Sequence, residues 1–159
     1  MHRPHRFCPY CGRALPGGPW PRTCHRCAQS SYLNPAPVVV LLLPVGTGLL
    51  AVRRGIDPGR GQLALPGGFI DLGESWQQAC ARELAEETGV RIGPDEVSLL
   101  DVQSTERHLL VLGKGPHLDV NRLPPFVANA ECTERLVLTA PAELAFPLHT
   151  QAARRFFNG

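Results

Sequence analysis

Three glutamates at helical spacing, Glu83, Glu86 and Glu87, constrain most strongly what this chain can fold into. The segment from about Ser75 to Thr88 predicts a helix, and Gly89 follows where a left-handed C-cap residue is expected. With about 3.6 residues per turn, the three carboxylates converge on one side of this helix, beside its apolar side chains. A helix of this kind has to neutralise or solvate three like charges at one place.

A divalent cation would resolve that crowding. Like charges at i, i+4 repel each other, and an apolar neighbourhood adds a desolvation cost. Mg²⁺ prefers oxygen ligands, usually one or two carboxylates together with substrate phosphate and water. The alternative is a solvated acidic face on which Arg82 serves as a local ion-pair partner. The glutamates alone leave both interpretations open.

The wider pattern around the glutamates is more specific. It has the spacing Gly-x5-Glu-x7-Arg-Glu-U-x-Glu-Glu-x-Gly-U, where U is a bulky aliphatic residue, and the nine matching positions are Gly68, Glu74, Arg82, Glu83, Leu84, Glu86, Glu87, Gly89 and Val90. This pattern resembles the Nudix box. The resemblance implies an α/β fold, the Nudix α/β/α sandwich with a mixed sheet. It also implies an enzyme that hydrolyses the pyrophosphate bond of a nucleoside diphosphate linked to a group X.

The resemblance also implies roles for individual residues. The catalytic candidates are Glu83, Glu86, Glu87, Arg82 and Glu74. Glu83 and Glu87 would bind Mg²⁺ or Mn²⁺ together with the Gly67 carbonyl, and Glu86 would bind a further metal ion or act as base. Arg82 would orient the glutamates, and Glu74 would support them from the preceding loop. The family varies in which glutamate deprotonates water, so that role stays open.

Two Cys-x-x-Cys pairs, Cys8 with Cys11 and Cys24 with Cys27, lie ahead of this region with 12 residues between them. Two such pairs can present four thiolates to one tetrahedral zinc ion. A segment of about 34 residues buries too little apolar surface to fold unaided, so a metal would supply folding free energy. Disulfides and free thiols are the alternatives, and disulfides are disfavoured in a cytosolic chain.

The N-terminal segment differs in charge from the rest of the chain. Residues 1–34 contain no Asp or Glu and five arginines, namely Arg3, Arg6, Arg13, Arg22 and Arg26, whereas the remaining residues hold 11 Lys and Arg against 14 Asp and Glu. We therefore expect a zinc ribbon at 1–34 and a catalytic domain at 35–159. The segment resembles the ribbon ahead of the Nudix domain in NADH pyrophosphatases and related ADP-ribose or flavin-dinucleotide hydrolases. Nucleic-acid binding by the basic ribbon is the alternative, and His2, His5 and His25 are expected at its surface.

Hydrophobic patterning predicts the remaining elements of the second domain. Pro66 to Gly68 is expected as a turn, and Ala142–Leu144 as a single helical turn. A terminal helix is expected at 151–157. Strands are expected at 38–43, 49–53, 62–65, 97–102, 109–112, 126–128 and 136–138. Of the other cysteines, Cys80 is expected at a buried helix position, and Cys132 has no predicted role.

Several residues outside the box are further candidates. Glu131 or Glu134 could supply the additional acidic residue found in many Nudix relatives, and the sequence does not choose between them. Arg53, Arg54 and Arg60 could hold substrate phosphates or be ordinary surface charges, so the substrate-binding residues are not assigned.

The substrate preference is predicted from a missing motif. The NADH pyrophosphatase branch carries a Ser-Gln-Pro-Trp segment after the box, whereas this chain has Gln103-Ser-Thr-Glu-Arg107 there. We therefore expect ADP-ribose or flavin adenine dinucleotide to be preferred over NADH. A nucleic-acid-directed hydrolase acting on RNA 5′ ends and a non-catalytic Nudix-like ligand sensor are the alternatives.

The expected setting is cytoplasmic. The chain has no apolar run near the ~20 residues of a membrane span and no hydrophobic signal core, so no membrane association is expected. Nudix relatives are often dimers, and the sequence leaves a homodimer open.

Overall fold

The computed structural model describes residues 5–159, so the expectations for His2 and Arg3 lie outside the described residues. The chain divides into two compact units, one ending at Pro35 and the other covering Ala36–Gly159.

The first unit is built from two cysteine turns and a short hairpin. In each turn the backbone N–H four residues after the first cysteine donates to that cysteine's carbonyl, at 2.9 Å from Gly12 to Cys8 and 2.9 Å from Ala28 to Cys24. Strands β1 (Arg22–Thr23) and β2 (Ser30–Ser31) pair antiparallel around the second turn. The two cysteine pairs are therefore carried by turns of matching geometry.

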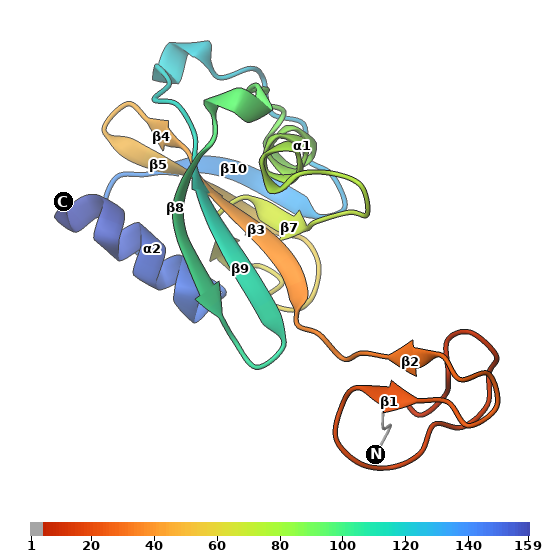
Figure 1. Cartoon of the computed structure of the whole chain (residues 1–159). Coiled ribbons are helices and arrows are strands. Elements are labelled where there is room, and N and C mark those ends of the chain that lie inside the picture. Colours follow the sequence, from red (N-terminus) through yellow and green to blue (C-terminus); the bar gives the residue numbers. More distant parts are fainter. Residues whose placement is uncertain (1–4) are drawn as a thin grey trace. The chain divides into compact units, whose positions relative to one another are not determined.

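The second unit contains two four-stranded sheets (Figure 1). Its strands are β3 (Ala36–Leu42), β4 (Pro44–Val45), β5 (Gly48–Arg54), β6 (Leu63–Ala64), β7 (Gly67–Phe69), β8 (Ser98–Ser104), β9 (His108–Lys114) and β10 (Cys132–Leu138). One sheet has the order β7-β3-β9-β8. The other has the order β10-β5-β4, with β6 also paired to β5. The β3–β9 pair is parallel and the other pairs are antiparallel, so the predicted mixed sheet is confirmed.

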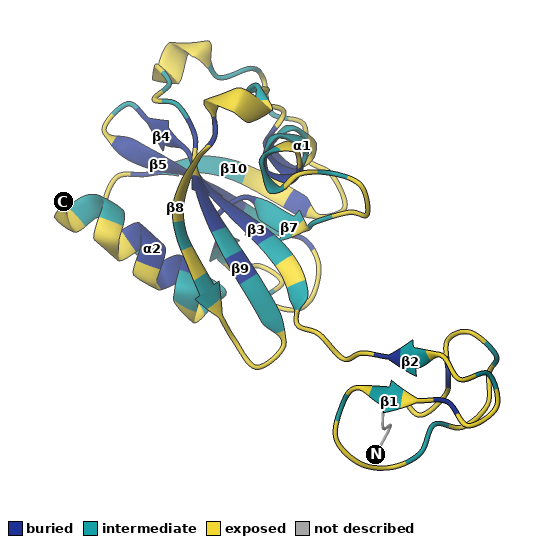
Figure 2. Ribbon diagram, viewed as in Figure 1, coloured by how far each residue is buried: buried dark blue, intermediate teal, exposed yellow. Residues whose placement is uncertain are grey.

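Two helices cover opposite faces of these sheets (Figure 1). They are α1 (Trp76–Thr88) and α2 (Pro147–Asn158), and short 3₁₀ turns occupy Pro94–Glu96 and Val120–Arg122. Alternate residues of a strand face opposite sides of a sheet. In β3, Val39 and Leu41 pack in the core that includes α1, whereas Val40 and Leu42 pack in the core that includes α2. The predicted α/β/α sandwich is confirmed, and β3 and β5 form its buried centre (Figure 2).

The expected turn at Pro66–Gly68 is wrong, because Gly67–Phe69 forms β7 and pairs with β3. A Cβ on Gly67 would lie 2.2 Å from the Val39 carbonyl oxygen. The glycine at position 67 therefore allows β7 and β3 to approach closely.

Two weaker predictions are also wrong. Residues 126–128 are not a strand, because Asn129 closes a turn just ahead of β10 by accepting from the Cys132 backbone N–H at 2.8 Å. Residues 142–144 are not helical, because the backbone leads into a strand-like bond from Ala145 N–H to the Leu63 carbonyl at 2.7 Å. The terminal helix begins at Pro147, earlier than expected, because proline is well suited to the first turn of a helix.

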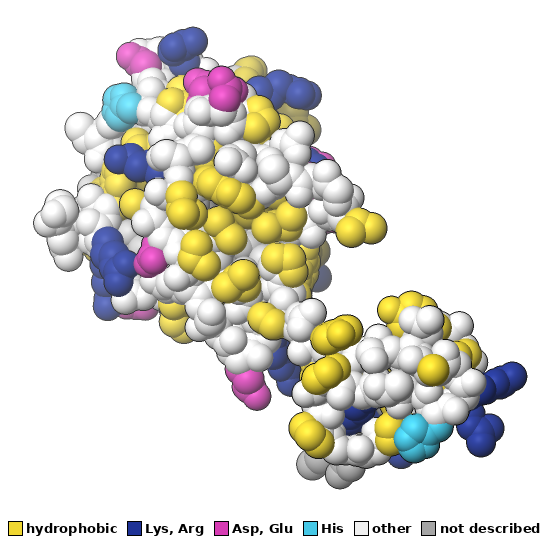
Figure 3. Space-filling view, in the orientation of Figure 1, with side chains coloured by type: hydrophobic (Ala, Val, Ile, Leu, Met, Phe, Trp, Pro, Cys, Tyr) yellow, Lys and Arg dark blue, Asp and Glu magenta, His cyan; other side chains and the backbone are white. Residues whose placement is uncertain are grey.

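Strand β8 leaves apolar side chains at the surface. Hydrophobic side chains gather over this part of the unit (Figure 3), and Leu99, Leu100 and Val102 are about half exposed. Within the described residues, no helix has the length and hydrophobicity that a membrane crossing requires.

Candidate functional site

Helix α1 is held at both ends by residues that favour helix boundaries. Ser75 accepts from the Gln78 backbone N–H, and the Gln78 side chain accepts from the Ser75 backbone N–H, which completes a capping box. Gly89 ends the helix in the left-handed conformation, with φ at 75°, as predicted. These caps set the start and end of the helix that carries the glutamates.

Arg82 connects four groups around the helix. Its Nε and Nη2 donate to the two carboxylate oxygens of Glu74, at 3.2 and 2.7 Å. Its Nη1 donates to Glu83 at 2.7 Å and to Glu86 at 3.1 Å, and Nη2 also donates to the Phe69 carbonyl at 3.0 Å. Charge-assisted bonds of this kind fix carboxylate orientation, and the Arg82 bond holds the pKa of Glu74 below its usual range.

Glu83 and Glu87 are buried, whereas Glu86 is exposed. Glu87 accepts from the Gly67 backbone N–H at 3.0 Å, but burial outweighs this bond and raises its pKa to about 7. Burial likewise raises the pKa of Glu83, and the Arg82 guanidinium opposes that shift. Two desolvated carboxylates beside each other favour protonation or a bound cation.

Glycine at position 68 is required by the closeness of the helix to β7. A Cβ on Gly68 would lie 2.3 Å from Oε1 of Glu83. Any side chain here would therefore displace a buried carboxylate. The glycine in the box thus makes room for a neighbouring glutamate.

The two buried glutamates and the two glycines of β7 line a mostly apolar pocket of about 570 Å³. Its polar lining comes from Glu83, Glu87, Glu131, Arg54, Asp71, Thr105, His108 and His149, together with the backbone of Gly67 and Gly68. Glu86 and Glu74 are not among the lining residues and are connected to the pocket through Arg82. Pockets of this size hold small-molecule ligands.

The structure separates the acidic and basic candidates that the sequence left open. Glu131 lines the pocket, whereas Glu134 receives the Arg53 Nε bond at 2.7 Å on an exposed part of β10. Arg53 also donates to the Gly61 carbonyl, and Arg60 lies 3.7 Å from Asp57 at the surface. Arg54 is the arginine of the three that lines the pocket.

The lining groups outside the candidates from sequence include Phe146, His149 and Thr105. Phe146 and His149 come from the start of α2, with ring centroids 5.0 Å apart, and the Arg54 guanidinium lies 5.1 Å from the Phe146 ring. The third, Thr105, comes from the end of the β8–β9 hairpin. The segment from Ala142 to His149 resembles a C-terminal segment common in Nudix proteins, but a histidine two residues after a proline is a weak signal for a site residue.

Cys132 and Cys80 are both buried. Cys80 occupies the buried helix position that was predicted. Cys132 lies beside Glu87, and burial together with the Glu87 charge raises the pKa of this thiol to about 12.

The divalent cation that the family implies fits this pocket. The donors are hard carboxylate oxygens, they are desolvated, and their charges are only partly balanced by Arg82. Within residues 5–159, only the four N-terminal cysteines form a group of three or more ligand atoms that all lie within 4.8 Å of one another.

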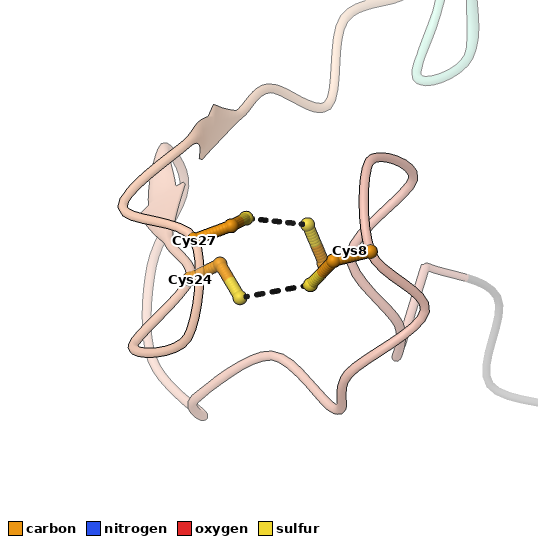
Figure 4. Close-up of side chains that lie close together, drawn as sticks. Cys8, Cys24 and Cys27 are labelled. Carbon is orange, nitrogen blue, oxygen red and sulfur yellow. Dashed lines mark hydrogen bonds between the residues drawn. The ribbon is translucent and has the colours of Figure 1, made fainter.

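Those four cysteines form a compact cluster in the first unit (Figure 4). The Sγ–Sγ distances are 3.7 Å for Cys8 and Cys27 and 3.6 Å for Cys11 and Cys24. A disulfide needs about 2.0 Å, whereas a tetrahedron of sulfurs about 2.3 Å from zinc has edges of about 3.8 Å. The spacing therefore fits a metal ion and excludes disulfides between these pairs.

Fold and site together define an α/β/α sandwich protein whose first helix brings buried glutamates to a glycine-lined pocket. A family profile for the NUDIX domain matches residues 33–156. The chain belongs to the NUDIX domain family.

Comparison with curated proteins finds relatives named NAD-capped RNA hydrolase NudC. The protein from Salmonella heidelberg (strain SL476) is 30% identical over 94 residues, which are 58% of this chain and 36% of the relative. The protein from Edwardsiella ictaluri (strain 93-146) is 33% identical over 90 residues, which are 55% of this chain and 35% of the relative. The matched region thus spans about a third of these relatives.

Solved structures share the fold. A NUDIX hydrolase from Nitrosomonas europaea superposes with a TM-score of 0.72 at 24% identity, covering 96% of this chain and 90% of that one. A bifunctional NMN adenylyltransferase/ADP ribose pyrophosphatase from Francisella tularensis gives a TM-score of 0.59 at 24% identity, covering 69% of this chain and 35% of that one.

Proposed function

We propose that the chain is a divalent-metal-dependent hydrolase that cleaves the pyrophosphate bond of a nucleoside diphosphate linked to a group X. The observation that carries this proposal is the pair of buried glutamates, Glu83 and Glu87, in one pocket with Arg54. Buried carboxylates without full charge compensation suit a cation, and an arginine in the same pocket suits a phosphate.

Mg²⁺ or Mn²⁺ would be held by Glu83, Glu87 and the Gly67 carbonyl, and it would neutralise charge that develops on the phosphoryl oxygens. The protein's own contribution is positioning. Arg82 keeps Glu83 in place, and the Gly67 N–H does the same for Glu87. Glu86, on the exposed side of Arg82, would serve a further metal ion.

Glu131 is the acidic residue we propose as an addition to the site, in preference to Glu134. It lines the pocket and carries no side-chain ion pair within the described residues, whereas Glu134 is paired with Arg53. A carboxylate with this placement suits a general base, since it can accept a proton from water near the glutamates.

For the substrate we propose ADP-ribose or a related dinucleotide such as flavin adenine dinucleotide, with NADH poorer. The absence of the Ser-Gln-Pro-Trp segment supports this order. The names of the curated relatives refer to NAD-capped RNA, so a capped RNA belongs in the same test.

The first unit we propose as a structural zinc ribbon that binds one Zn²⁺ through Cys8, Cys11, Cys24 and Cys27. Support comes from sulfur spacings that match a tetrahedral zinc site. The homodimer that the resemblance to Nudix relatives allows for this chain stays a prediction.

The substrate test compares kcat/KM for ADP-ribose, flavin adenine dinucleotide and NADH, with an NAD-capped RNA oligonucleotide alongside. We expect ADP-ribose or the flavin dinucleotide to lead. If NADH is favoured tenfold or more, which is about 1.4 kcal/mol of transition-state discrimination, the argument from the missing segment is wrong. A lead for the capped RNA would instead support the nucleic-acid alternative.

A further inference from the structure

His149, the third residue of α2, is a buried polar side chain that the proposed reaction does not use. We propose that its Nε2–H donates a hydrogen bond to a neutral acceptor on the substrate's base, a ring nitrogen or a carbonyl oxygen. His149 would then be a specificity-determining residue. This inference rests on the proposed function, because it assigns a role within the same pocket.

The backbone selects which ring nitrogen of His149 carries the proton. The Leu65 N–H donates to Nδ1 at 3.2 Å, deep in the protein. A neutral imidazole has one donor and one acceptor nitrogen, so Nδ1 as acceptor leaves the proton on Nε2. Burial, with a smaller contribution from the Arg54 charge, lowers the pKa of His149 to about 4 and keeps the ring neutral at pH 7.

Nε2 is left for a ligand. No group in residues 5–159 makes a hydrogen bond to it, although His149 lines the pocket. Nε2 is also not sealed inside the protein, because the one sealed side-chain polar atom without a partner in the described residues is Ser31 Oγ. A donor that reaches the pocket and has no protein acceptor is available to substrate.

The ring is also held in place. It packs against Phe146 with 5.0 Å between centroids, and Arg54 lies over the same phenyl ring while its Nε donates to the Pro58 carbonyl at 2.7 Å. The pocket thus offers a cation for phosphate and, nearby, a neutral donor for an uncharged acceptor. A site built to hydrogen-bond one substrate group rejects analogues that lack it.

Two substitutions separate the ring's two nitrogens. His149→Asn places an amide oxygen near the position of Nδ1, so it keeps an acceptor for Leu65 and removes the pocket donor. His149→Gln is longer and can present its amide N–H near the position of Nε2, but it gives up the Leu65 acceptor. If His149 had only a structural role, His149→Asn would be closer to wild type than His149→Gln in both unfolding temperature and KM.

The test measures kcat, KM and thermal unfolding for the full chain and both variants, with Mg²⁺ and with ADP-ribose, flavin adenine dinucleotide and NADH. We expect His149→Asn to unfold near the wild-type temperature. Its KM for the best substrate should rise about fivefold to tenfold, because that is the typical effect of losing one hydrogen bond. His149→Gln should unfold at a lower temperature yet keep KM closer to wild type.

An unchanged KM in His149→Asn, for every substrate that the wild type hydrolyses, would overturn the inference and leave the proposed function standing. If the wild type hydrolyses none of them, the proposed function fails. Calorimetric titration with ADP-ribose in EDTA then decides the inference separately. It survives if His149→Asn weakens binding severalfold, and it fails if the two proteins bind equally or neither binds.

Discussion

We expect the charge of Glu87 to matter most at the proposed metal site. Glu87 is 5% exposed, and the hydrogen bond from the Gly67 N–H, the Cys132 thiol and the Arg54 charge offset its burial only in part. We expect Glu87→Gln to lower turnover by at least about a hundredfold, because it removes a cation-binding charge while keeping the side chain's size. Assays over a range of Mg²⁺ concentrations measure this, with circular dichroism to check the fold.

Glu134→Gln is the matched control for that change. Glu134 is half exposed and paired with Arg53, and surface ion pairs of this kind contribute about 0–1 kcal/mol to stability. Its turnover should stay within about threefold of wild type. A Glu87→Gln variant as active as Glu134→Gln would remove Glu87 from the metal site.

Gly68 makes a second prediction at the residue scale. A Cβ at this position would lie 2.3 Å from a Glu83 oxygen, so Gly68→Ala should push that carboxylate out of place. We expect turnover to fall more than tenfold and the Mg²⁺ requirement to rise. Gly61→Ala is a comparison, since a Cβ there meets nothing within 4 Å, although its positive φ carries some strain. Equal activity of the two variants would contradict the close packing of helix and strand.

At the scale of elements, the start of α2 links stability to pH through His149. Its pKa is about 4 in the folded protein against 6.5 for an ordinary histidine, so the unfolded chain binds more protons between these values. The contribution of neutral His149 to the free energy of unfolding is therefore fully present above about pH 6.5. It falls as the pH drops, and about 2 kcal/mol of it is lost at pH 5.

The measurement is denaturant unfolding at pH 7 and pH 5 for wild type and His149→Asn. The difference between the two proteins has to be used, because the raised pKa values of Glu83 and Glu87 favour the folded state as pH falls. Asparagine does not titrate, so the wild type should lose about 2 kcal/mol more than the variant. Equal losses would show that His149 titrates normally in the folded protein.

Elements with a strong local pattern could be predicted from the sequence, and elements that depend on distant partners could not. Helix α1 carries its caps and its apolar spacing within one segment, which is why its bounds were predicted closely. Strand β7 was missed because two glycines carry no pattern, and its pairing depends on β3. Residues 142–144 have a sequence typical of a helical turn. The next backbone N–H, that of Ala145, donates instead to the carbonyl of Leu63, some 80 residues away.

The site residues also divide into those that a local sequence pattern predicts and those whose position depends on distant partners. Glu83, Glu86, Glu87 and Arg82 lie within one helix, so their convergence follows from helical periodicity. The choice of Glu131 over Glu134, and of Arg54 over Arg53, depends on which face of two paired strands meets the pocket. A β-bulge in β10 between Cys132 and Glu134 shifts that register, and nothing in the local sequence predicts it.

For the whole molecule, the two units should respond separately to loss of zinc. Cys24→Ser removes one of four clustered ligands, so we expect zinc content to fall from about one per chain toward zero and the first unit to lose its structure. The second unit has its own cores and should unfold at an unchanged temperature. Elemental analysis and calorimetry test both parts. Cys80→Ser, outside the cluster, is the control for zinc content.

We propose that the pocket at α1 carries out metal-dependent hydrolysis of a pyrophosphate bond. The most direct measurement incubates the full chain with ADP-ribose and flavin adenine dinucleotide, with Mg²⁺, with Mn²⁺ or with EDTA, and separates the products. We predict release of AMP with either metal, none with EDTA, and a rate at least about a hundredfold lower for Glu87→Gln. Hydrolysis that persists in EDTA, or that Glu87→Gln leaves unchanged, would contradict it.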